Sequence, residues 1–241
     1  MKRLNTFNFF FLIFYFSFAL SNQKNNSEYR LEPETVLSQR SQELKVGEAK
    51  NAIIVSANKY STDMAWNILK SGGNAADATV TLQLVLGLVE PQSSGIGGGS
   101  FLTYLDKKNN SVITYDGRET APFYATENLF LDDNKKSISF FDAVVGGLSV
   151  GVPGTLDLLF TFHRDYGELS WEEVIKPVIK LAENGFYPPK RLRNAILKEK
   201  FLLNENINND YFSKIKKKPL NKIKNLEYAS TLKKISADYK I

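Results

Sequence analysis

The sequence predicts an α+β fold in which helices are layered against a small antiparallel sheet. Residues 74–89 carry apolar side chains at helical spacing, and a glycine-rich loop at 95–99 follows them directly. Two β-rich runs at 101–105 and 112–115 flank a polar turn, which indicates a hairpin. Helical patterns resume after this hairpin, and that order of elements is typical of a mixed, layered architecture.

Length and composition are those of an ordinary globular protein. The 241 residues are 43% hydrophobic, which suits one domain or one large part of a bigger domain. The chain has no cysteine, and His163 is its only histidine. These counts exclude disulfides, zinc–thiolate sites and multi-histidine metal sites, so we expect neither a metal nor a cofactor. His163 itself is expected on a helix surface, facing solvent or partly buried.

The N-terminal segment has the layout of a secretory signal peptide. Two basic residues precede an apolar run at 7–20, and small residues near its end allow cleavage. The run is shorter than the ~20 residues that a membrane-spanning helix needs. We therefore expect residues 1–21 to be removed, the protein to be periplasmic or secreted, and membrane contact to be transient. A retained signal-anchor or a misassigned start codon is the alternative. Residues 22–47 read as a polar linker before a main body at 48–241.

Basic residues are concentrated near the C-terminus. Residues 190–241 contain 14 Lys and Arg against 5 Asp and Glu, which leaves 17 of 31 and 21 of 26 for residues 1–189. The lysine cluster at 216–218 is a pattern that nucleic acids or anionic membranes attract. No glycine–aromatic RNA-binding signature or helix-turn-helix pattern accompanies it. A solvated, lysine-rich helical surface is the better interpretation, and no nucleic-acid partner is expected.

The first elements of the main body have clear local signals. A β-branched run at 52–57 predicts a buried strand. Ser61 or Thr62 then caps an amphipathic helix that stops at Gly72 and Gly73. Asn74 begins the next helix with Asp77 three places on, a capping-box spacing, and the small apolar residues of that helix predict deep burial.

The second half of the main body is predicted to be mainly helical. Residues 120–142 read as a loop, and a glycine-rich turn precedes a helix at about 155–166. Ser170 and Glu173 form a capping box for a further helix that ends near residue 185. Pro177 lies inside that helix and is expected to kink it. The remaining residues are predicted to be helical and basic.

Two glycine motifs imitate known catalytic or cofactor-binding patterns. Residues 95–100 nearly match the dinucleotide fingerprint, but they follow a helix and precede a strand, which is the reverse of the required order. Residues 147–151 match the G-x-S-x-G pattern of a serine hydrolase. His163 follows too soon in the chain for the usual order of acid and then histidine. We therefore expect neither cofactor binding nor a serine nucleophile.

Arg118 is the polar residue that the pattern singles out, because it comes directly after the second strand of the hairpin. A planar guanidinium matches a carboxylate with two parallel hydrogen bonds, which suits recognition of an amino acid's α-carboxylate. The structural alternative is a strand-end arginine that pairs with Glu119 or Asp116. Spacing alone favours this alternative.

Five separated motifs resemble those of the large subunit of γ-glutamyltranspeptidases. They occur in the family's order within a similarity that covers about residues 48–240, and they are SGGNAADA at 71–78, EPQ at 90–92 with GIGGGSF at 95–101, GRETAP at 117–122, GVPGT at 151–155 and AENGF at 182–186. The resemblance implies an N-terminal-nucleophile hydrolase with an αββα sandwich, incomplete in this fragment. It also implies that Arg118 holds the substrate α-carboxylate.

The activity that the resemblance implies is that of a γ-glutamyltransferase and glutathione hydrolase. Such proteins are zymogens that cut themselves into two subunits and so free a threonine whose amino group is the general base. The threonine attacks the γ-glutamyl amide of glutathione or a related compound, and the acyl group passes to water, an amino acid or a peptide. The small subunit of the same precursor is the implied partner.

The sequence departs from this family pattern at its C-terminal end. No Thr-Thr-His segment is present, and the nucleophilic threonine is expected beyond Ile241. We therefore expect this chain to supply substrate recognition but no catalytic residue, and to be inactive by itself. A cephalosporin acylase-like member of the family and a non-catalytic exported α/β binding module are the alternatives.

Overall fold

The computed structural model describes residues 47–199, 210–218 and 220–238. The expected signal segment at 1–21 and nearly all of the expected linker at 22–47 lie outside these ranges. The elements are α2 (Lys59–Lys70), α3 (Ala75–Val89), β1 (Ser100–Asp106), β2 (Ser111–Gly117), α4 (Phe140–Val144), α5 (Thr155–Tyr166), α6 (Trp171–Asn184), α7 (Lys190–Lys198), α8 (Asp210–Lys217) and α9 (Leu226–Asp238). This mixture of helices and an antiparallel hairpin is the predicted α+β class.

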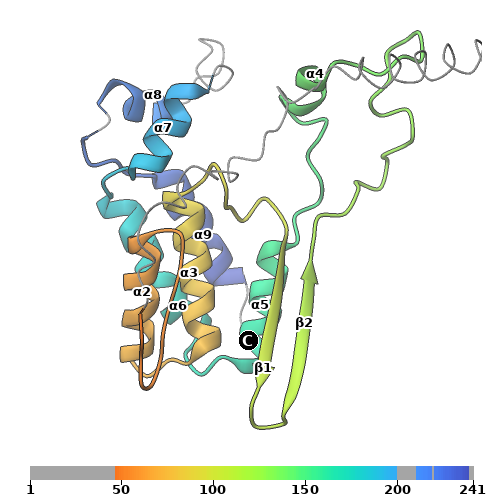
Figure 1. Cartoon of the computed structure of the whole chain (residues 1–241). Helices are drawn as coiled ribbons and strands as arrows, with labels where there is room; N and C mark the ends of the chain where they lie inside the picture. The colour runs from red at the N-terminus through yellow and green to blue at the C-terminus, as the bar shows by residue number, and fades with distance from the viewer. Residues whose placement is uncertain (1–46, 200–209, 219, 239–241) are drawn as a thin grey trace, which may run out of the picture. The chain divides into compact units, whose positions relative to one another are not determined.

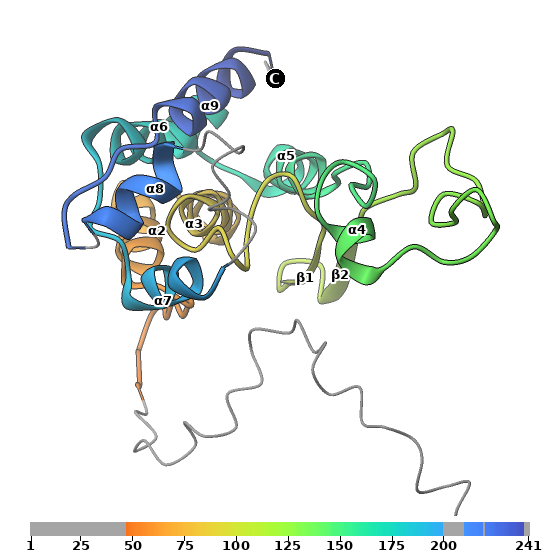
Figure 2. The ribbon, with the colours of Figure 1, turned by 90° about the horizontal axis from the view of Figure 1, so that it is seen from above.

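Helix α3 lies at the centre of the helical layer. It contacts α2, α5 and α6, while α9 packs along α6 and α7 contacts α8 (Figures 1 and 2). Helix α5 lies between α3 and the hairpin and contacts both strands. The hairpin is therefore attached to the helical layer mainly through α5. Within the described ranges, no helix combines the length and hydropathy needed to cross a bilayer.

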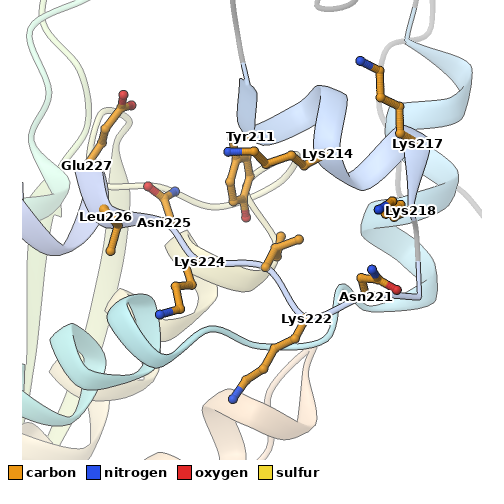
Figure 3. A pocket seen from close by; sticks show the side chains of 11 residues that line it. Tyr211, Lys214, Lys217, Lys218, Asn221, Lys222, Lys224, Asn225, Leu226 and Glu227 are labelled. Carbon is orange, nitrogen blue, oxygen red and sulfur yellow. The ribbon is translucent and has the colours of Figure 1, made fainter.

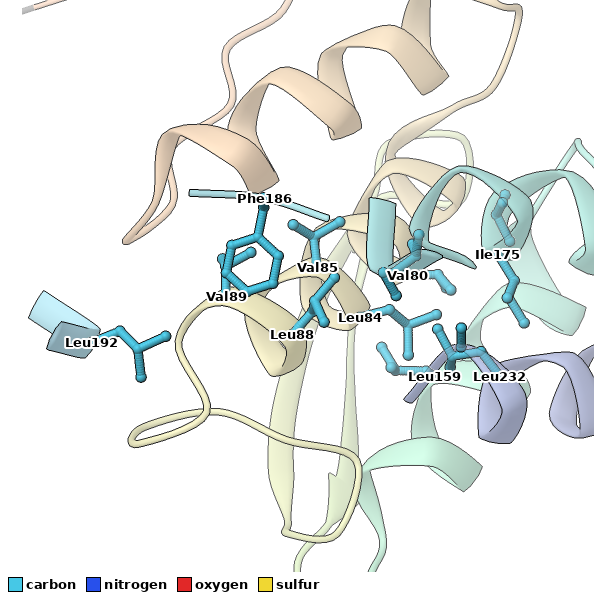
Figure 4. Packing of buried hydrophobic residues seen from close by; sticks show 14 of the residues in the cluster. Val80, Leu84, Val85, Leu88, Val89, Leu159, Ile175, Phe186, Leu192 and Leu232 are labelled. Carbon is cyan, nitrogen blue, oxygen red and sulfur yellow. The ribbon is translucent and has the colours of Figure 1, made fainter. Parts of the chain in front are cut away.

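The core is built around the small apolar residues of α3, as the sequence predicts. Val80, Leu84 and Val85 are completely buried, and they pack with residues of α5, α6 and α9 (Figure 4). Burying one such side chain contributes about 1.5–3 kcal/mol. Because α3 is buried on several sides, it fixes the positions of the helices that surround it.

The hairpin has one covered face and one exposed face. Strands β1 and β2 pair in antiparallel register from Ser100 opposite Gly117 to Asp106 opposite Ser111. On the covered face, the rings of Tyr104 and Tyr115 lie 5.2 and 5.6 Å from the ring of Phe162 in α5. On the other face, large apolar side chains are exposed, and these are Phe101, Leu105 and Val112.

Several predicted boundaries agree with the structure. The capping box of α3 pairs Asn74 with Asp77, and that of α6 pairs Ser170 with Glu173. The hairpin is confirmed, and α5 has the predicted bounds. Helix α6 continues through Pro177 to Asn184.

Two predictions near the loops are wrong, and a third is wrong only at its end. Residues 52–56 form no strand, and Ile53 and Val55 are 61% and 82% exposed, because no neighbouring strand of the described region pairs with them. The cap of α2 is Asn58, whose side chain accepts from the backbone N–H of Tyr60, rather than Ser61 or Thr62. The expected loop at 120–142 gives way to α4 at its end.

The buried carboxylate of Asp77 joins α3 to α5 and to the turn between α5 and α6. Its Oδ2 atom accepts a hydrogen bond from the backbone N–H of Asn74 at 2.8 Å and closes the cap of α3. The backbone N–H groups of Glu168 and Leu169, between α5 and α6, donate to the same carboxylate at 3.2 and 3.3 Å. His163 Nε2 of α5 lies 3.0 Å from Asp77 Oδ1. One side chain therefore ties the start of α3 to the α5–α6 turn.

The expectation that His163 faces solvent or is only partly buried is wrong. Its side chain is 2% exposed, and its ring lies 5.2 Å from the ring of Trp171. Burial lowers the pKa of His163 below its usual value, although the nearby Asp77 carboxylate opposes this shift. The periodicity of α5 does not reveal this environment, because Asp77 precedes His163 by 86 residues in the chain.

Asp77→Asn is expected to destabilise the fold strongly. The amide keeps the volume of the carboxylate but directs N–H groups at backbone donors, and disrupting such a buried charged network costs about 3 kcal/mol. Urea unfolding should show this loss. Asp133→Asn is the matched control, because Asp133 is exposed, and it should change stability by less than about 0.5 kcal/mol. Equal effects of the two substitutions would contradict a structural role for Asp77.

Candidate substrate-recognition site

Three glycine-containing segments meet at the start of α5. The carbonyl of Gly98, in the loop after α3, accepts hydrogen bonds from the backbone N–H groups of Gly154 and Thr155 at 3.2 and 3.1 Å. Helix α5 has no side-chain cap, so the glycine-rich loop supplies the acceptor that a capping side chain would otherwise provide. The loop and the helix are therefore one structural unit.

The segment after β2 is attached to the same unit. Thr120 and Val152 form an antiparallel bridge, with backbone hydrogen bonds of 3.2 and 2.8 Å. Gly117 and Gly154 pack backbone against backbone. A Cβ on Gly154 would lie 2.7 Å from the carbonyl carbon of Gly117 and 2.9 Å from the carbonyl oxygen of Arg118. Glycine at this position lets the chain after β2 lie directly on the start of α5.

The side chain of Glu119 fills the space left by two other glycines. A Cβ on Gly99 would overlap the Glu119 carboxylate and lie 2.8 Å from the Glu119 backbone nitrogen. A Cβ on Gly151 would lie 2.9 Å from Glu119 Cβ. Gly99 and Gly151, from two of the three segments, thus make room for one acidic side chain directly beside Arg118.

We call the place where the three segments 98–99, 117–120 and 151–155 meet the glycine crossing. Arg118 projects from this crossing, and few contacts constrain its guanidinium. Its side chain is 59% exposed, its Nε lies 3.5 Å from Glu119 Oε2, and its Cζ lies 5.8 Å from the ring centre of Phe101. Asp116 accepts the backbone N–H of Arg118 at 3.0 Å, so it supports the turn. An exposed ion pair and an exposed cation–π contact each contribute only about 0–1 kcal/mol. The guanidinium is therefore oriented but remains accessible to an anion.

A depression of ≈310 Å³ adjoins this crossing. Its lining comes from the end of β2, the Thr120–Val152 bridge and the first turns of α5, and it includes Arg118, Asp116 and Asp157. Positive and negative side chains therefore border the same small space. Such a lining suits a small ligand that carries both charges.

The described residues form neither a serine-hydrolase site nor a metal site. Ser149 lies in a turn with no strand before it, and its hydroxyl donates to the carbonyl of Val144 at 3.2 Å. His163 is buried against Asp77, which leaves no accessible base of the serine-hydrolase kind at this position. Among the described residues, no group of three His, Asp or Glu side chains is placed to hold a metal ion.

Sequence reasoning identified Arg118 and named Glu119 as a possible partner, but it missed the backbone contacts that position both residues. Gly98 and Gly154 act through contacts between segments that are far apart in the chain, and Gly99 and Gly151 make room for the Glu119 side chain. The available signal was the clustering of glycine at three places, each next to a predicted strand end or helix start. That signal shows where backbones pack closely, but it does not show which segments meet.

Comparisons with known proteins point to one family. The sequence model of the family described as Gamma-glutamyltranspeptidase matches residues 61–239. The glutathione hydrolase proenzyme of Bacillus subtilis strain 168 is 42% identical over 147 residues, which are 61% of this chain and 25% of that protein.

Two solved structures are similar to the fold. The γ-glutamyltranspeptidase from Pseudomonas nitroreducens, complexed with L-DON, matches with a TM-score of 0.70 and 32% identity, over 79% of this chain and 56% of that one. The γ-glutamyltranspeptidase of Helicobacter pylori matches with a TM-score of 0.71 and 30% identity, over 80% and 56%.

These findings place the protein in a class and a family. The fold and the family match define an α+β protein related to γ-glutamyl-transferring enzymes. The chain belongs to the gamma-glutamyltranspeptidase family, whose model matches more than half of its residues. It spans about a quarter of the length of the curated relative from Bacillus subtilis.

Gly99→Ala is expected to disturb the crossing, whereas Gly97→Ala in the same loop is the matched control. A methyl group on Gly99 would collide with Glu119, while one on Gly97 meets nothing within 4 Å. Overpacking of this kind costs about 1–3 kcal/mol. Thermal unfolding should therefore show a lower Tm for Gly99→Ala and little change for Gly97→Ala. Similar Tm values for both variants would show that the crossing is not tightly packed.

Proposed function

We propose that the protein containing this chain is a γ-glutamyltransferase and glutathione hydrolase, and that Arg118 binds the α-carboxylate of the γ-glutamyl group. The observation that carries this proposal is the glycine crossing, which holds an exposed guanidinium in place with only weak contacts. The family match supports the reaction class. Glutathione and related γ-glutamyl compounds are the proposed substrates.

Hydrogen-bond energies favour binding of the Arg118 guanidinium to a ligand carboxylate over its present contacts. Two parallel charge-assisted hydrogen bonds contribute about 1.5–3 kcal/mol each, more than the 3.5 Å contact with Glu119 and the Phe101 contact together. Glu119 stays beside the bound carboxylate and keeps the guanidinium oriented. Both negative groups can be accommodated because a guanidinium has five N–H donors.

The proposed role of Arg118 is positioning by binding, not chemistry. The α-carboxylate is remote from the scissile γ-amide, so the guanidinium fixes the substrate while the reaction occurs at the other end. There a threonine hydroxyl forms an ester with the γ-carbonyl, and the amine leaves with a proton. Water or an acceptor amine then breaks this ester, and the hydroxyl regains its proton. We propose that the threonine belongs to the small subunit released from the same precursor.

We also propose that the hairpin belongs to a larger αββα sandwich. Its outer face exposes Phe101, Leu105 and Val112, and both of its edges are unpaired among the described residues. Exposed apolar sheet faces and open strand edges are ordinarily covered in a folded protein. Further strands of the precursor are the proposed cover.

Export is the remaining part of the proposal. It rests on the basic and apolar layout of residues 1–21. N-terminal sequencing of the protein from its native cell should begin near Asn22, from a periplasmic or secreted fraction. An intact Met1 on cytosolic protein would contradict export, and an intact Met1 on membrane-bound protein would indicate a retained anchor.

Arg118→Gln, made in the full-length precursor and assayed after self-cleavage, is expected to weaken substrate binding. Loss of two charged hydrogen bonds should lower kcat/KM by at least about tenfold, chiefly through a higher KM, because the carboxylate is bound before and during the reaction. Arg118→Lys keeps the charge but lacks the planar pair of N–H donors, so its kcat/KM should lie between those of the wild type and of Arg118→Gln. Steady-state kinetics with a chromogenic γ-glutamyl anilide measure both parameters.

The matched control is Arg164→Gln. Arg164 is also an exposed arginine, with 51% of its side chain accessible, and it pairs with neighbouring Asp165 at 2.9 Å. Its loss should leave KM unchanged. If KM of the Arg118→Gln enzyme stays within about twofold of wild type, equivalent to ~0.4 kcal/mol, Arg118 is only a strand-end residue.

A further inference from the structure

A second hollow lies between α8 and the start of α9, and lysines dominate its lining. Its volume is ≈740 Å³ (Figure 3). The charged side chains on its border are Lys214, Lys217, Lys218, Lys222, Lys224 and Glu227, and the amides of Asn221 and Asn225 add further polar groups. The glycine crossing contributes nothing to this lining.

Four of these lysines have no counter-ion among the described residues. Lys217, Lys218, Lys222 and Lys224 take part in no ion pair there, whereas Lys59 pairs with Asp63 at 2.7 Å. The segment 210–224 contains six lysines and one acidic residue. Positive charge around this hollow therefore outweighs the single negative charge of Glu227, and the resulting positive potential attracts anions.

Buried contacts hold the backbone of this lysine-rich segment in place. Ile215 and Ile223 are 0% and 6% exposed, so the chain is anchored in the core on both sides of the turn. Ile223 also forms a bridge with Phe186, with two backbone hydrogen bonds of 2.9 Å, and the N–H of Asn225 donates to the carbonyl of Ala182 at 3.0 Å. The lysines therefore start from fixed backbone positions.

We propose that this lysine-lined hollow binds a linear polyanion, a chain that carries phosphate or carboxylate groups at regular intervals. The ammonium groups do not converge on one point, and Figure 3 shows Lys217 and Lys222 pointing away from each other. This spread suits repeated charges along a chain better than one small anion. Ammonium groups act as point charges and so accept either kind of anionic group.

The lining is less suited to the other polyanionic surfaces. Single-stranded nucleic acids are held largely by stacking on exposed aromatic rings. The aromatic residue of this lining, Tyr211, is half-buried, and its hydroxyl donates to the Leu88 carbonyl at 3.4 Å. An anionic membrane presents a flat surface, whereas these lysines border a hollow.

The test compares two variants that each lose four positive charges. The first replaces Lys217, Lys218, Lys222 and Lys224 with Gln, and the matched control replaces the exposed Lys107, Lys108, Lys135 and Lys136 with Gln. Fluorescence anisotropy with labelled inorganic polyphosphate and, separately, labelled poly-L-glutamate measures Kd over a range of salt concentrations. Thermal unfolding of each variant checks that the fold is intact.

Binding of either polymer by the wild type should weaken at least tenfold in the first variant and much less in the control. The slope of log Kd against log salt should also become shallower in the first variant, because fewer counterions are exchanged. The polymer that binds more tightly identifies the preferred anionic group.

Four outcomes would overturn the proposal. They are no binding of either polymer, equal losses in the two variants, equally tight binding of orthophosphate, and tighter binding of a charge-matched oligonucleotide or of phosphatidylserine vesicles than of both polymers. The last outcome would identify a nucleic-acid or membrane surface instead.

Discussion

The buried carboxylate of Asp77 is the interaction on which the arrangement of the helices depends. It is completely buried, and it accepts hydrogen bonds from backbone groups at the start of α3 and in the α5–α6 turn. His163 adds a contact from within α5. A buried carboxylate is tolerated only when such donors surround it. Asp77 therefore fixes the C-terminal end of α5, while Gly98 fixes its N-terminal end through Gly154 and Thr155. Because α5 also carries the hairpin, these two anchors determine where β2 ends and where Arg118 projects.

The sequence predicts the elements whose causes are local. The cap at Asn74, the helix stop at Gly72, whose φ is +100°, and the turn between β1 and β2 each depend on a few neighbouring residues. The strand expected at 52–57 depends on a partner strand, and the structure places none beside it within the described ranges. The burial of His163 likewise depends on a residue far away in the chain. Long-range partners therefore account for what local patterns miss.

The candidate site shows the same division. Arg118 is identifiable because it comes directly after a predicted strand and lies in a motif that resembles the family's. Its surroundings are not, since Glu119 fits between Gly99 and Gly151 only after three separate segments come together. Arg118 can be interpreted either as a substrate-binding residue or as a strand-end structural residue. The weakness of its present contacts separates these two interpretations better than its exposure does. A 3.5 Å contact with Glu119 and a distant ring leave most of its hydrogen-bonding capacity for a ligand.

A direct interaction between the Arg118 guanidinium and the substrate α-carboxylate can be tested with a thermodynamic cycle that removes each group in turn. The enzyme and its Arg118→Gln variant would each be assayed with a γ-glutamyl anilide and with the 4-aminobutyryl anilide, which lacks only the α-carboxylate. We predict that removing the carboxylate lowers kcat/KM strongly in the wild type and little in the variant, with a coupling energy of at least about 1.5 kcal/mol. Equal losses in both enzymes, and hence a coupling energy near zero, would contradict it.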